Sequence, residues 1–94
     1  MRVRQYAPSN NKKTEEETAQ QLINWHFHNF MNIQLGSDWT SQELVERVSK
    51  KEEGHDYSDT TITYYLDGVP KLKLEPAYEP HGNKLSFTIK ATHL

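Results

Sequence analysis

The stretch TSQELVERVSKKEEGHDYSDTTITYYLDGV, residues 40–69, decides the fold that this sequence predicts. Thr40 is a favoured helix-capping residue, and Glu43, three positions later, completes a capping box with it. Apolar positions at helical spacing follow, and the charged run after them reaches Gly54, a residue typical of a helix end. This part of the stretch therefore predicts one amphipathic helix and a polar turn.

The second half of the same stretch carries another helix-start signal. Ser58 is a favoured capping residue, Ile62 and Leu66 follow at spacings of four, and Gly68 with Pro70 marks a stop. Ser58, Ile62 and Leu66 would then share one buried stripe. We expect a helix over residues 58–69.

A long helix is expected before this stretch, over residues 14–35. Thr14 and Glu17 form a capping box, and Gly36 follows the last apolar position. Such a helix is about 33 Å long, more than a small core needs, so its exposed part is expected to pack against a second copy of the chain. The residues predicted at this dimer interface are Trp25, Phe27 and Met31.

From Lys71 onward the apolar period changes from helical to two, which predicts a β-hairpin. The turn cluster of residues 79–83 separates its two strands. The alternating apolar positions are Leu72, Leu74, Leu85, Phe87, Ile89 and Ala91.

The order of a long helix, a T-S-x-E-L helix, an S-x-x-T-I-x-x-x-L helix and a hairpin resembles the winged helix-turn-helix superfamily. The matching residues are Thr40, Ser41, Glu43, Leu44, Ser58, Thr61, Ile62, Leu66, Val69, Leu72, Leu74, Leu85, Phe87 and Ile89. The resemblance implies an α+β fold of three helices followed by a β-hairpin wing, over residues 14–94. It also implies DNA binding by the third helix. The chain departs from the family pattern in its long turn and its lack of Arg, Lys, Asn or Gln on the exposed third helix.

Charge is distributed unevenly along the 94 residues, whose net charge is −2. Residues 1–13 carry four basic and no acidic side chains, residues 14–70 carry three basic against eleven acidic, and residues 71–94 carry four against two. Residues 1–13 are therefore expected to form a basic arm, which is either a flexible terminus or a segment that follows phosphates.

Composition excludes several classes of protein. The chain has no cysteine, so it has neither a disulfide framework nor a cysteine zinc site. It has no apolar run of the length a membrane span needs and no signal-peptide pattern, which predicts a cytoplasmic protein. His26 and His28 would lie on different sides of a helix, so no metal site is expected.

The candidate nucleic-acid site combines the arm, the expected third helix and the wing. Lysines on the wing have a second interpretation, because charged side chains also protect sheet edges from aggregation. The predicted DNA-contacting residues are Arg2, Arg4, Lys12, Lys13, Ser58, Thr60, Thr61, Thr63, Tyr64, Lys71, Lys73, His81, Asn83 and Lys84.

The sequence thus favours a small dimeric DNA-binding protein, a transcriptional regulator of prokaryotic, phage or mobile-element type that acts by occupancy. The alternative is a winged helix that binds a basic protein partner through the acidic face from Glu43 to Asp67, as a phage inhibitor of a host factor would. No catalytic constellation or phosphate loop is recognisable, so neither an enzyme, a cofactor nor a small-molecule substrate is expected.

Overall fold

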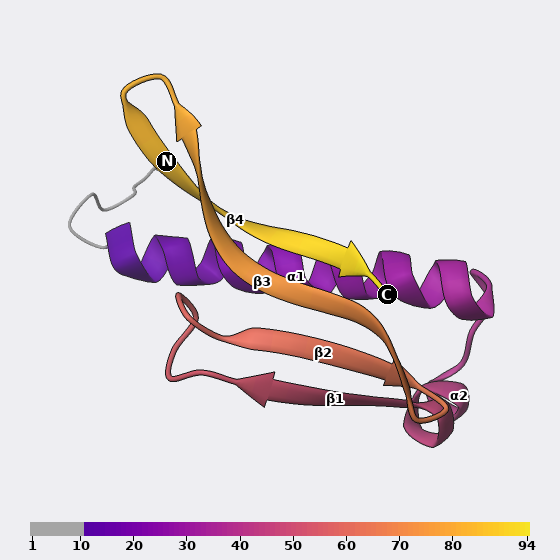
Figure 1. Cartoon of the computed structure of the whole chain (residues 1–94). Helices are drawn as coiled ribbons and strands as arrows, with labels where there is room; N and C mark the ends of the chain where they lie inside the picture. The colour runs from indigo at the N-terminus through magenta and orange to yellow at the C-terminus, as the bar shows by residue number, and fades with distance from the viewer. Residues whose placement is uncertain (1–10) are drawn as a thin grey trace.

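A computed structural model of the chain describes residues 11–94, with the side chains of all of these except residues 11–14 and 81. The elements are α1 (Asn11–Leu35), α2 (Ser41–Arg47), β1 (Val48–Glu53), β2 (Thr61–Leu66), β3 (Val69–His81) and β4 (Lys84–His93). The strands form one antiparallel sheet in the order β1-β2-β3-β4, and α1 lies across one face of it (Figure 1). The fold is α+β, but the expected winged helix-turn-helix is wrong.

The predicted third helix over residues 58–69 does not exist, because this segment contains β2 and the turn into β3. Ile62 and Leu66 are four apart, a spacing that fits a helical stripe and also one face of a strand. Burial alternates residue by residue along TITYYL, which is the pattern of a strand. Asp67 and Gly68, with φ of 53° and 83°, then form a two-residue hairpin turn of the kind that Asp-Gly favours.

The helix that begins after Thr40 is also shorter than expected. Its capping box is confirmed, since the Thr40 side chain accepts from the Glu43 amide and the Glu43 carboxylate accepts from the Thr40 amide. However, α2 ends at Arg47, and Val48 has extended backbone angles that start β1. The six residues VSKKEE become a strand because they pair along the whole of β2.

The long first helix is confirmed, with its end at Leu35, although it begins at Asn11 rather than with a cap at Thr14. Gly36 follows with φ of 92°, and its amide donates to the Asn32 carbonyl. Met31, which the sequence places at a dimer interface, is instead fully buried in the core, whereas Ile33, two residues later, is 61% exposed.

The hairpin expected from the alternating positions is present as β3 and β4, but it is not a separate wing. Its strands pair from Leu72 with His93 to His81 with Lys84, and β3 also pairs with β2. A β-bulge between Tyr64 and Tyr65 of β2 leaves Lys71 as the extra residue on β3. The predicted wing is therefore half of the sheet.

The core lies between α1 and one face of the sheet, which we call the helix face. Phe30 and Met31 of α1 pack there with side chains from the three strands that follow β1. Figure 1 shows α1 on one side of the sheet only, so within residues 11–94 the opposite face is uncovered, and we call it the open face. The buried strand residues are Ile62, Tyr64, Leu66, Leu72, Leu74 and Ile89.

Candidate functional site

A groove runs between α1 and β1 on the helix face. It exists because α1 packs mainly against β4 and β3, so the half of the sheet formed by β1 and β2 is only partly covered. Two adjoining hollows of about 440 and 310 Å³ share Gln20, Ile23 and Lys50 and together form what we call the α1–β1 groove.

The groove has an apolar floor and a polar rim. Its floor is formed by Ile62, Leu74 and Ile89 near the β1–β2 loop, and by Phe27, Leu44 and Tyr64 near α2. Its rim carries Gln20 and Asn24 from α1 and Lys50 and Glu52 from β1. An apolar cleft edged by a few polar groups is the usual form of a binding site.

The outer edge of β1 borders this groove, and its backbone geometry follows from one hydrogen bond. The Asp67 amide donates to the Arg47 carbonyl at 2.8 Å, which continues the β1–β2 ladder by one residue pair. In an antiparallel ladder, hydrogen-bonded residue pairs alternate with pairs that are not hydrogen-bonded to each other. Because Arg47 and Asp67 are a hydrogen-bonded pair, Ser49 and Lys51 also direct their backbone N–H and C=O groups toward β2. Lys50 and Glu52 direct theirs outward, away from the sheet.

The rim of β1 carries two ion pairs between residues two apart. On the helix face Lys50 Nζ lies 2.8 Å from Glu52 Oε2, and on the open face Lys51 Nζ lies 3.8 Å from Glu53 Oε2. The hydrogen bond to Glu52 raises the pKa of Lys50. All four side chains are about half exposed or more, so these pairs contribute little to folding stability and remain accessible to a partner.

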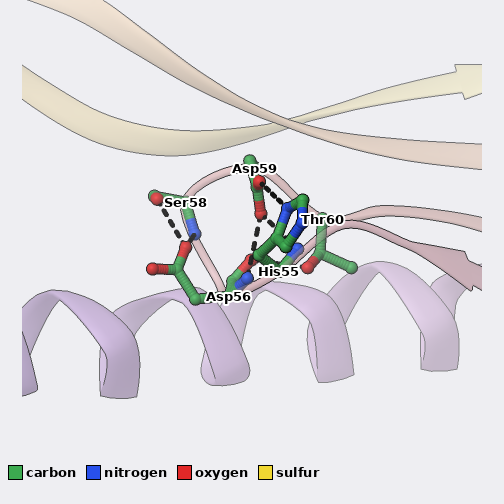
Figure 2. Close-up of polar contacts among 5 residues, drawn as sticks. All are labelled: His55, Asp56, Ser58, Asp59 and Thr60. Atoms are coloured by element: carbon green, nitrogen blue, oxygen red, sulfur yellow. Dashed lines mark hydrogen bonds and ion pairs between the residues drawn. The ribbon is translucent and has the colours of Figure 1, made fainter.

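The β1–β2 loop, residues 54–60, closes one end of the groove and is held by its own side chains (Figure 2). The Asp59 carboxylate accepts from the backbone amides of His55 and Asp56 at 2.8 and 2.9 Å and contacts His55 Nδ1 at 3.1 Å. These contacts lower the pKa of Asp59 to about 2, the amides of Asp56 and His55 contributing most. Ser58, in turn, donates from both its amide and its hydroxyl to Asp56 Oδ1.

A second set of contacts attaches the N-terminal part of α1 to the sheet. Glu15 Oε1 accepts from the hydroxyls of Tyr57 and Tyr78 at 2.6 and 2.9 Å, and both tyrosine rings meet the Phe87 ring edge-on. The hydrogen bond to Glu15 raises the pKa of Tyr57 to about 12. This clamp joins α1, the β1–β2 loop and the β3–β4 hairpin beside the loop end of the groove.

The predicted DNA-contacting residues whose side chains the structure describes are spread over a loop, the core and three strands. Ser58 and Thr60 lie in the β1–β2 loop, and Tyr64 is buried against Phe27 and Phe30, with ring centroids 4.9 and 6.0 Å apart. Some of the others lie on β2, β3 and β4 or in the β3–β4 turn: Thr61, Thr63, Lys71, Lys73, Asn83 and Lys84. Arg2 and Arg4, and the side chains of Lys12, Lys13 and His81, lie outside the described part of the chain.

Four open-face residues do form a row across the sheet. Lys51 pairs with Thr63, Thr63 with Lys73, and Lys73 with Thr92. Acidic side chains accompany this row, since Lys73 Nζ lies 3.7 Å from Glu75 and Lys51 is paired with Glu53. The face therefore alternates in charge.

The three residues predicted at the dimer interface differ in how exposed their side chains are. Trp25 is 63% exposed, Phe27 is half-buried against Tyr64, and Met31 has no exposed surface. Of the three, Trp25 is the side chain most available to a second copy. The homodimer itself stays a prediction.

The edge of β1 did not emerge from the sequence as a candidate site. VSKKEE has no alternation of apolar and polar residues, so nothing local marks it as a strand. The signal lay further on, in TITYYL followed by Asp67-Gly68, which predicts a hairpin and hence a sheet with edges. From that hairpin, a further strand before β2 at the edge of the sheet could have been predicted.

No family model, curated protein or solved structure matches this chain. Across residues 11–94, neither helix has both the length and the apolar character that crossing a membrane requires.

Proposed function

We propose that this protein is a protein-interaction module that binds an extended segment of a partner by strand addition. The segment would pair with the outer edge of β1 and place alternate side chains in the α1–β1 groove. The observation that carries this proposal is the position of an outward-facing strand edge directly beside an apolar groove on the same face. In this mode of recognition backbone hydrogen bonds supply affinity, and the groove selects side chains.

The geometry of β1 supports strand addition over binding of a helix or a small molecule. Lys50 and Glu52 direct backbone groups outward at regular spacing, which a helical ligand does not match. Each ladder hydrogen bond contributes on the order of 1 kcal/mol net, so a short ladder gives modest affinity and the contacts in the groove add the rest. The expected complex is transient and salt-sensitive.

The decisive test removes one outward amide from the edge. Proline is tolerated on an edge strand when its missing amide faces solvent, so Lys50→Pro should fold with the β1–β2 ladder intact but lose a bond to the added strand. Lys50→Ala is the matched control, since it removes the same charge and keeps the amide. Selection from a displayed library of extended peptides, followed by titration, should give binders that Lys50→Ala retains and Lys50→Pro loses. Equal binding by both variants would contradict strand addition at this edge.

A second candidate function is DNA binding, now through the open face. It is favoured by the row of Lys51, Thr63, Lys73 and Thr92, because lysine and hydroxyl groups are common phosphate contacts. Fluorescence anisotropy with random-sequence duplex at two salt concentrations tests it. Affinity that falls steeply with salt and is lost in Lys51→Ala/Lys73→Ala would support it. The glutamates beside both lysines make it the weaker candidate.

A further inference from the structure

The side chains of β1 present an ordered pattern of charge along the edge. Val48, Lys50 and Glu52 lie opposite Leu66, Tyr64 and Ile62, so they belong to the helix face. The three residues between them belong to the open face: Ser49, Lys51 and Glu53. From Val48 to Glu53, the successive side chains on the helix face are apolar, basic and acidic, and those on the open face are polar, basic and acidic.

Every neighbouring pair of strands in this sheet is antiparallel, and an added strand that continues this arrangement has its register fixed by the charges of β1. Residues directly opposite each other in an antiparallel pair lie on the same face, and a slip of one residue moves every side chain to the other face. Opposite charges at facing positions stabilise a sheet and like charges destabilise it. Each charged residue of β1 thus specifies the sign of the residue that faces it.

We infer that the partner segment carries, from its N- to its C-terminus, basic, acidic, acidic, polar and apolar side chains. These would face Glu52, Lys51, Lys50, Ser49 and Val48 in turn. This inference rests on the proposed strand addition and names the class of strand that β1 accepts. Its apolar residue would lie over the end of the groove lined by Leu44 and Phe27.

The two ion pairs already present on β1 are consistent with this pattern. Lys50 and Glu52 lie 2.8 Å apart along the helix-face rim, so an acid facing Lys50 and a base facing Glu52 would extend one pair into a square of alternating charge. Such charge arrays discriminate between partners more than they raise affinity. Their effect should weaken as salt increases.

The same charges make a second copy of β1 a poorer occupant than the inferred segment. In a symmetric antiparallel pair one residue faces its own copy at the centre. A pair centred on any of residues 50–53 therefore places Lys against Lys or Glu against Glu there, even where opposite charges meet beside the centre, as Lys50 and Glu52 do around Lys51. The inferred segment places an opposite charge against each of Lys50, Lys51 and Glu52 and has no such repulsive contact. A repulsive contact with unwanted partners and an attractive one with the right partner are the two components of specificity.

Synthetic peptides of identical composition test this inference. The peptide TKEETVT has the inferred order, and TEEKTVT exchanges the residues that would face Glu52 and Lys50 while keeping the net charge. Titration of each into the labelled protein, followed through the amide resonances of Lys50 and Glu52, should show TKEETVT binding about tenfold more tightly at low salt. The difference should shrink at high salt.

A charge-swapped protein supplies the matched control. Lys50→Glu combined with Glu52→Lys keeps the net charge and the ion pair of the rim, and it should reverse the preference so that TEEKTVT binds better. If both proteins bind both peptides equally, the inferred charge order is wrong while strand addition stands. If neither peptide shifts the outward amides and Lys50→Pro also matches Lys50→Ala with library peptides, the proposed function fails as well.

Discussion

Replacement of Gly54 by alanine should destabilise the protein far more than the same change at Gly68. Both glycines have positive φ, 147° and 83°, where a side chain strains the backbone. The surroundings differ, because a Cβ at Gly54 would lie 2.5 Å from the Thr60 Cα and 2.7 Å from the Asp59 carbonyl oxygen, whereas a Cβ at Gly68 meets nothing within 4 Å.

The magnitudes follow from these contacts. Backbone strain alone costs roughly 1–2 kcal/mol for alanine at positive φ, which is the whole effect expected at Gly68. At Gly54 the overlap with backbone atoms forces the loop to shift, so we expect about 3–4 kcal/mol in total. A domain of 94 residues has a free energy of unfolding of roughly 5–14 kcal/mol, so Gly54→Ala removes a large part of it.

Urea denaturation followed by tryptophan fluorescence measures both variants, since Trp39 is half-buried and donates to Asn32 at 3.0 Å. The two m-values should agree with that of the parent protein, so that the shift in midpoint reports stability. Equal losses at Gly54 and Gly68 would refute the close packing of the β1–β2 loop. Because Gly54 also lines the α1–β1 groove, Gly54→Ala should weaken peptide binding even where it remains folded.

Three further outcomes are expected. The pKa of Tyr57 is raised to about 12 in the folded protein, against an ordinary value of 10. The hydrogen bond from the protonated Tyr57 hydroxyl to Glu15 therefore stabilises the fold fully below pH 10, and this contribution is lost as the pH rises toward 12. Melting temperatures measured from pH 9 to 12 should show this loss in the parent protein and a smaller one in Tyr57→Phe. Asp67→Asn should change the melting temperature by less than about 3 °C, because asparagine also suits the first turn position and the ion pair it removes is exposed; a large drop would mean that the pair with Arg47 holds the turn. If α1 forms a homodimer, Trp25→Ser should halve the mass measured by light scattering without loss of helix, because Trp25 is exposed. Met31→Ser should instead unfold the chain, because Met31 is fully buried. An unchanged mass for Trp25→Ser would count against an interface formed by α1.

The local signals at Thr40 and Gly36 predicted the local features correctly, whereas those at Thr14 and Ser58 did not. The Thr40 and Glu43 capping box forms because both partners lie within one helical turn, and the end of α1 at Gly36 depends only on that residue and Asn32. The strands of the β3–β4 hairpin were recognisable because one of their faces is buried and the other is not. In each case the energetic cause lies within a few residues of the signal.

The region 48–69 was predicted wrongly because its structure depends on distant partners. The spacing of Ile62 and Leu66 fits both a helix and a strand. Packing against α1 and the pairing of Ile62 with Leu74 make this segment a strand. Residues 48–53 become a strand only because β2 offers an unpaired edge. The candidate site could not be predicted from the sequence for the same reason. The groove exists only because α1 is offset toward β4, and no single stretch of sequence encodes this offset.

The packing of α1 against β4 has a consequence for how the chain is made. Every strand pairs with its neighbour in sequence, so the sheet can assemble in order as it leaves the ribosome. The helix, by contrast, is synthesised before the sheet, and the strand against which it packs most, β4, is synthesised last. During synthesis its apolar stripe is exposed to solvent and to chaperones. A ribosome that stalls within β4 would therefore release a nascent chain with an unprotected apolar helix, a form that quality-control proteases should remove first.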